Sequence, residues 1–108
     1  MAIRVQLTWQ KLEGNFNSAD EARDDLRQFY PEEQRQANDA WHDQMVADGT
    51  LRKPMERIWN PENKTLTYIR EINDVDAYDA SKPYEISDVD MYVAQAGWVQ
   101  IDFDRTEI

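Results

Sequence analysis

Cysteine is absent from this chain of 108 residues, histidine occurs once, and no apolar run is long. The lack of cysteine excludes disulfides, thiolate nucleophiles and zinc sites built on sulfur. No stretch comes near the roughly 18 apolar residues that a transmembrane helix needs, so no membrane span is expected. The N-terminus MAIRVQLTW has neither the apolar core nor the cleavage site of a signal peptide. We therefore expect a cytoplasmic protein.

Positive charge is also scarce, because 12 Lys and Arg stand against 22 Asp and Glu, for a formal net charge of −10. Such a field repels phosphate, which disfavours nucleic-acid and anionic-membrane partners. An acidic domain could instead mimic nucleic acid toward a basic protein, and this interaction module remains one alternative function. The acids are dispersed along the chain rather than gathered in a run, which is typical of solubilising charge.

The first half of the chain predicts a strand followed by two helices. With 41% apolar residues, one packed domain over residues 1–108 is expected. Alternation over residues 3–9 is typical of a strand with one buried face. A capping box at Ser18 and Glu21 predicts a helix near 18–29. Pro31 then begins a second helix over 31–48, which ends at a glycine.

The second half predicts a hairpin, a helix and a last strand. The hairpin turns at Asn60-Pro-Glu-Asn63, between alternating residues 55–59 and a β-rich segment at 65–72. A polar loop follows. Residues 87–97 have a capping serine, helical spacing and a terminal glycine, which favours a helix, with a strand as the alternative. Residues 98–103 alternate as a terminal strand.

This order of elements predicts a ferredoxin-like α+β fold, a four-stranded antiparallel sheet with helices on one face. The other face would then need a cover. From the alternation, we expect that Trp9, Trp59, Ile69 and Trp98 do not all lie on the helix side. Exposed aromatics on a sheet mark a partner or a ligand. We therefore predict a homodimer that forms sheet to sheet.

The layout, with MVADGTLRK leading into ERIWNPENKTLTYIRE, resembles small dimeric α+β barrel proteins of the antibiotic-biosynthesis-monooxygenase-like superfamily. The resemblance covers most of the chain in the order of its elements. It implies two ferredoxin-like subunits whose sheets press together. The superfamily includes cofactor-free oxygenases, isomerases, haem-associated enzymes and members without known activity, so the resemblance implies no single function and no catalytic residue.

His42 is the only histidine and the best candidate for a catalytic base. The helical pitch places it about 100° from Trp41 and points Asp43 further away, so we do not expect His42 and Asp43 to form a hydrogen-bonded dyad. Asp39, one turn earlier, could pair with His42 instead. An ordinary polar position on the flank of a helix is the competing interpretation, and it is favoured because no nucleophile can be placed nearby.

Acidic residues at 74–85 partly match a calcium-binding loop. Asp74, Asp76 and Glu85 occupy three ligand positions, but Tyr78 and Asp79 stand where an acid or amide and the turn glycine are required. A solvated acidic loop is the better interpretation. No metal site and no cofactor are predicted.

The strongest remaining signal is a group of aromatic and arginine residues on the predicted strands. They could form core or dimer interface, or they could line a small-ligand cavity between the sheet and the helices. An arginine in such a cavity would favour an anionic ligand. The predicted ligand-binding residues are Trp9, Arg57, Trp59, Tyr68, Arg70 and Trp98. A cofactor-independent oxygenase or isomerase acting on a small aromatic or anionic metabolite is the enzymatic alternative.

Overall fold

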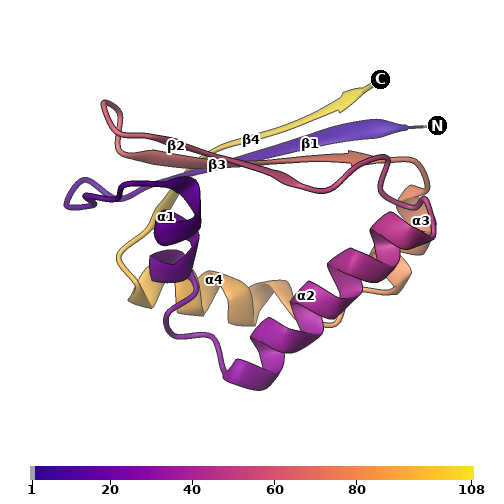
Figure 1. Cartoon of the computed structure of the whole chain (residues 1–108), viewed down its shortest axis with the longest axis horizontal. Helices are drawn as coiled ribbons and strands as arrows, with labels where there is room; N and C mark the ends of the chain where they lie inside the picture. The colour runs from indigo at the N-terminus through magenta and orange to yellow at the C-terminus, as the bar shows by residue number, and fades with distance from the viewer. Residues whose placement is uncertain (1) are drawn as a thin grey trace.

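The protein is a four-stranded antiparallel sheet with helices on one face (Figure 1), as a computed structural model of residues 2–108 shows. The strand order is β2-β3-β1-β4, and every pair of neighbours is antiparallel. The predicted α+β class is therefore confirmed. No helix in residues 2–108 is long and apolar enough to cross a membrane. The elements are β1 (Ile3–Gln10), α1 (Ala19–Leu26), α2 (Glu32–Ala47), β2 (Glu56–Asn60), β3 (Thr65–Ile72), α3 (Val75–Ala80), α4 (Ile86–Gln95) and β4 (Val99–Glu107).

The predicted cap at Ser18 and the glycine after the second helix are confirmed, whereas α1 ends at Leu26 rather than near residue 29. The hydroxyl of Ser18 accepts from the Glu21 amide, while the Glu21 carboxylate accepts from the amide of Asn17. Pro31 is the N-cap of α2 and supplies no side-chain bond, which leaves the acidic first turn to complement the helix dipole. Gly49 has φ of 76°, the left-handed conformation that ends a helix most easily when no side chain is present.

The second half of the chain contains two helices after the hairpin, α3 and α4. Residues 73–83 were expected to form a loop, but this was wrong, because the segment contains the short helix α3. The Asp74 carboxylate caps α3 by accepting from the Ala77 amide, and Tyr78 anchors it by burying its ring. The strand alternative for residues 87–97 is also excluded, since α4 occupies 86–95.

A β-bulge changes the faces of β4. Its register against β1 shifts between Thr8 and Trp9, so that Gln100 pairs with Trp9 but Phe103 pairs with Leu7. Both residues therefore point to the helix side of the sheet. Simple alternation, which placed Gln100 and Phe103 on opposite faces, was wrong because a bulge inserts one unpaired residue.

The expectation that Trp9, Trp59, Ile69 and Trp98 do not all lie on the helix side is confirmed, but only through Ile69, because the three tryptophans lie on the helix side. Trp9 and Trp98 are buried in a core cluster with α1, and Trp59 packs against that cluster through Phe16 and Trp98. Ile69 does point the other way. The uncovered face carries mainly threonine, glutamine and charged residues, among them a bond between the hydroxyls of Thr8 and Thr67. That face can remain in water without a cover.

The core consists of two separate clusters, one at each end of the sheet. The first lies under α1, which packs directly on β2 and β3. The second lies where α2 and α3 meet the other end of the sheet. Between the two clusters, α2 and α4 face the middle of the sheet from a greater distance (Figure 1). The first cluster contains Trp9, Ala22, Leu26, Tyr30, Leu66, Tyr68, Val93, Ala96 and Trp98, and the second contains Ile3, Met45, Leu51, Ile72 and Tyr78.

Candidate functional site

A cavity of about 500 Å³ lies between the sheet and the helices, and it extends between the two core clusters. This volume is in the range of small-molecule binding sites. Its floor is the middle of the sheet, where Val5 and Leu7 of β1 are only half-buried. Aromatic side chains from the helices and their connections form its walls. These are Tyr30, Trp41, Tyr78 and Tyr84.

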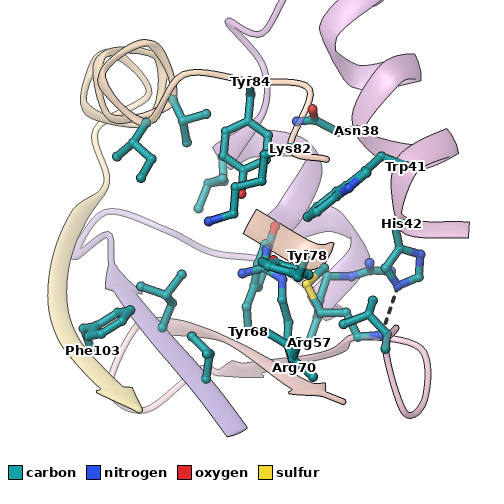
Figure 2. A pocket seen from close by; sticks show the side chains of 18 of the residues that line it. Asn38, Trp41, His42, Arg57, Tyr68, Arg70, Tyr78, Lys82, Tyr84 and Phe103 are labelled. Atoms are coloured by element: carbon teal, nitrogen blue, oxygen red, sulfur yellow. Dashed lines mark hydrogen bonds between the residues drawn. The ribbon is translucent and has the colours of Figure 1, made fainter. Parts of the chain in front are cut away.

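The exposed lining residues mark where the cavity opens. On α4 and at its start these include Ile86 and Asp90, and on β4 they include Gln100, Phe103 and Arg105. Ile86 is 61% exposed and Phe103 is 54% exposed. Five of the seven exposed lining residues come from α4 and β4, the other two being Asp39 and Asp79, and we infer that the main entrance lies between α4 and the edge strand β4. Figure 2 shows Phe103 on this strand, apart from the cluster of arginine and tyrosine side chains.

The cavity concentrates positive charge in an otherwise acidic protein. Six basic residues line it against three acidic ones, although acids outnumber bases in the whole chain by 22 to 12. Half of all basic residues therefore face this one space. The basic residues are Arg23, Arg27, Arg57, Arg70, Lys82 and Arg105, and the acidic ones are Asp39, Asp79 and Asp90.

Arg57, Tyr68 and Arg70 form a group on the floor of the cavity (Figure 2). Arg57 and Tyr68 are direct partners across β2 and β3, and Arg70 follows two residues later on the same face. The Arg70 guanidinium lies 5.9 Å from the centre of the Tyr68 ring. Within residues 2–108 Arg70 forms no ion pair, whereas Arg57 donates to the exposed carboxylate of Asp20 at 2.9 Å.

Three buried polar atoms of the lining have no hydrogen-bond partner within residues 2–108. They are the Tyr68 hydroxyl and the Nε atoms of Arg57 and Arg27. A buried donor left unpaired costs about 1–3 kcal/mol, so native proteins keep few of them. The whole Tyr68 side chain is buried, at 7% exposure, so water does not readily reach its hydroxyl. All three atoms can donate, so the cavity offers donors to an incoming acceptor.

The tyrosines of the cavity are held in their neutral form. Burial raises the pKa of Tyr68 to about 12 and the pKa of Tyr78 to about 12. Burial also raises the pKa of Tyr30 well above its usual range. Each phenol therefore keeps its proton at neutral pH and can donate it in a hydrogen bond. None of them is activated as a base.

His42 lines the cavity, but both of its ring nitrogens are engaged. Nε2 accepts from the Met55 amide at 3.1 Å, and Nδ1 lies 3.2 Å from the Asp43 carboxylate. An accepting Nε2 carries no proton, so the ring is the neutral tautomer with its proton on Nδ1. The expectation that His42 and Asp43 do not pair was wrong. Asp39 does not pair with His42 either, because it binds Arg27 at 3.0 Å.

The contacts of His42 point to a structural role. Its bond to Met55 ties α2 to the segment that leads into β2, as the dashed line in Figure 2 shows. The Asp43 carboxylate accepts a hydrogen bond from the Nδ1–H and thereby keeps the ring in the tautomer whose Nε2 can accept. A lone pair already bound to a backbone amide is not free to remove a proton from a substrate.

The structure brings most of the predicted ligand-binding residues to the cavity, and His42 with them. Trp9, Arg57, Tyr68 and Arg70 line it, but Trp59 and Trp98 do not. Trp98 is instead bound by its indole N–H to Asp25 at 2.9 Å, next to the ion pair of Asp25 with Lys11. Sequence reasoning missed five lining residues, namely Arg27, Trp41, Tyr78, Lys82 and Tyr84. Only Trp41 could have been found, because it lies on the apolar side of the predicted helix over 31–48.

The acidic segment at 74–85 stabilises the fold, since Asp74 caps the N-terminus of α3. Among residues 2–108 no three side chains of the metal-binding types come close enough to hold a metal ion. Asp79 forms an ion pair with Lys82 at 3.3 Å, and the Lys82 ammonium also lies 5.1 Å from the centre of the Tyr78 ring. These residues therefore belong to the wall of the cavity.

Compared with family models, curated proteins and solved structures, the chain has no match. The geometry of the cavity is therefore the basis on which a function can be argued.

Proposed function

We propose that the protein binds a small, largely apolar molecule in the cavity between its sheet and its helices. The observation that carries this proposal is an open space of about 500 Å³ that is bounded by aromatic side chains and contains buried donors without partners in residues 2–108. Such a space costs stability when it is empty, because its lining loses packing contacts. A ligand would restore those contacts. Binding is favoured over base catalysis because the lone pair of His42 is already used.

The test is a cavity-filling substitution. The wild-type protein should bind a neutral aromatic probe, naphthalene-2-carboxamide, with a saturable rise in melting temperature. At a probe concentration of 100 times Kd, linkage predicts a stabilisation of about 2.7 kcal/mol. Val5→Trp should abolish this rise, because the indole would occupy the middle of the floor. Thermal unfolding with increasing probe measures both effects.

Gln6→Trp is the matched control. Gln6 is the next residue of β1 and lies on the opposite face of the sheet. The indole introduced there would therefore leave the cavity empty. Binding in this variant should match the wild type. Equal loss of binding in both variants, or no binding by the wild type, would contradict a binding function for the cavity.

We also propose that the protein is a ferredoxin-like homodimer. The basis for this differs from the sequence argument, because the tryptophans are not on the free face. Every residue of β4 is exposed, including Val99, Ile101 and Phe103, and the outer edge of this strand is unpaired within residues 2–108. An exposed edge strand that carries apolar side chains tends to pair with another chain. A second copy on β4 would cover it.

Sedimentation velocity at micromolar concentration should give twice the monomer mass. Ile101→Glu should give monomers, because a charge on the apolar edge strand opposes pairing. Ile58→Glu places the same charge on β2, at the other edge of the sheet, and should leave the dimer intact. Dissociation by Ile58→Glu alone would point instead to another face of the sheet, and a monomeric wild type would exclude the dimer.

A further inference from the structure

The floor of the cavity has the chemistry of a carboxylate site. We propose that Arg57, Tyr68 and Arg70 bind the carboxylate of a small aromatic or otherwise apolar monocarboxylic acid. This inference rests on the proposed binding function and names the chemical class of its ligand. It places the carboxylate on the sheet and the apolar body among the aromatic walls. No covalent step is involved.

The donors present match one carboxylate. The Arg57 Nε–H and the Tyr68 hydroxyl are buried without partners within residues 2–108, and the guanidinium of Arg70 has no ion pair there. Guanidinium groups donate two parallel bonds to a carboxylate, and a phenol can add a third. Figure 2 shows these three side chains gathered together above the strands. A ligand carboxylate would therefore satisfy donors that have no partner among the described residues.

The surroundings favour a monoanion over a dianion. Asp20 already neutralises part of the charge of Arg57, and Asp39 does the same for Arg27. The whole chain carries a formal charge of −10, which opposes the entry of a second negative charge. Desolvating a dianion in a largely apolar cavity also costs more than desolvating a carboxylate. A phosphate monoester is thus the less suitable anion.

The rest of the cavity sets the shape of the ligand. The rings of Trp41 and Tyr78 contact each other in a tilted arrangement with centres 4.8 Å apart, and the ring of Tyr84 meets Trp41 edge to face at 5.9 Å. Flat aromatic walls favour a flat or apolar ligand body. Ligands enter between α4 and β4, where Arg105 lies at the rim without an ion pair in residues 2–108 and can attract an anion.

The experiment compares three probes that share one ring system, namely naphthalene-2-carboxylate, naphthalene-2-carboxamide and 2-naphthyl phosphate. Calorimetric titration of the full chain measures each Kd. The carboxylate should bind at least tenfold more tightly than the amide, because bonds to a charged group contribute about 1.5–3 kcal/mol and 1.4 kcal/mol is a factor of ten. The phosphate should bind more weakly than the carboxylate.

Substitutions assign the preference to the floor. Arg70→Gln should lower carboxylate affinity about tenfold or more and leave amide affinity within about twofold. Arg4→Gln is the matched control, since Arg4 lies on the neighbouring strand and on the opposite face of the sheet, and it should change neither. Tyr68→Phe should weaken carboxylate binding while leaving the ligand-free protein as stable as the wild type or more so, because it removes an unpaired hydroxyl.

The outcomes separate the two proposals. Equal affinity for carboxylate and amide would overturn the carboxylate site and leave the binding function standing. Tighter binding of the phosphate would overturn the choice of a monoanion. Absence of binding by all three probes would overturn both. A carboxylate preference that survives Arg70→Gln together with Arg57→Gln would place the anion elsewhere in the cavity and contradict this inference.

Discussion

Raising the pH from 10 to 12 is expected to unfold the protein, because buried tyrosines must ionise. In the folded chain the pKa values of Tyr68 and Tyr78 rise from 10.0 to about 12, and burial also raises the pKa of Tyr30. Above pH 10 the unfolded chain releases these protons and the folded chain does not, so stability falls as pH rises. Below pH 10 the contribution is fully present.

The size of this effect is comparable to the whole stability of a domain. A rise of two pKa units corresponds to about 3 kcal/mol per tyrosine, and small domains are stable by about 5–15 kcal/mol. Ionisation of the three buried tyrosines, measured by tyrosinate absorbance, and the change in tryptophan fluorescence should occur in one cooperative step as pH rises. The double variant Tyr68→Phe with Tyr78→Phe should move that step to higher pH. Ionisation of all five tyrosines of the chain with unchanged fluorescence would contradict the prediction.

The order of the elements could be predicted because it depends on local patterns. Alternation in β1 and β3, the cap at Ser18 and the glycine at 49 all act within a few residues of chain. The short helix α3 could not be predicted in this way. It has only six residues, too few for a helix that is stable by itself, and its stability comes from Tyr78, whose ring packs against Trp41 from another helix. Tertiary packing decided the conformation there.

The faces of the sheet were predicted less well than its strands. The bulge opposite Thr8 reverses the alternation of β4 and brings Phe103 to the helix side. No residue of β4 is of a type that indicates a bulge. Trp98 lies just before this strand, where a bond to Asp25 draws its indole into the core. A tryptophan can thus be buried by a partner distant in sequence, which a count of alternate residues does not include.

The candidate site was predicted in part, since the arginines were placed on the correct face. Arg57 and Arg70 share faces with Trp59 and Tyr68 by strand periodicity alone, and both line the cavity. The cavity itself follows from how far α2 and α4 stand from the sheet, which no local pattern encodes. The pairing of His42 with Asp43 was missed because the angle between neighbouring residues on a helix describes their Cβ positions, and side chains can swing from these toward each other.

Replacing Leu66 by alanine should lower the free energy of unfolding far more than replacing Leu7, which lies on the same face of the sheet. Leu66 is fully buried in the cluster under α1, at 0% exposure. Leu66→Ala should reduce the free energy of unfolding by about 3–4 kcal/mol, since the lost transfer energy is joined by the cost of a new void. Leu7 lines the existing cavity and is only half-buried. Leu7→Ala should cost about 1 kcal/mol, because its methyl groups already face open space.

Urea unfolding with a common slope would measure both costs. A saturating apolar ligand should widen the gap between the cavity variant and the wild type, because Leu7 then contributes contacts to the ligand that alanine cannot make. The cost of Leu66→Ala should stay the same with and without ligand, since Leu66 does not line the cavity. Equal costs at the two positions in the ligand-free protein would mean that the middle of the sheet is as tightly packed as the cluster beneath α1, and the cavity would then have no volume to offer a ligand.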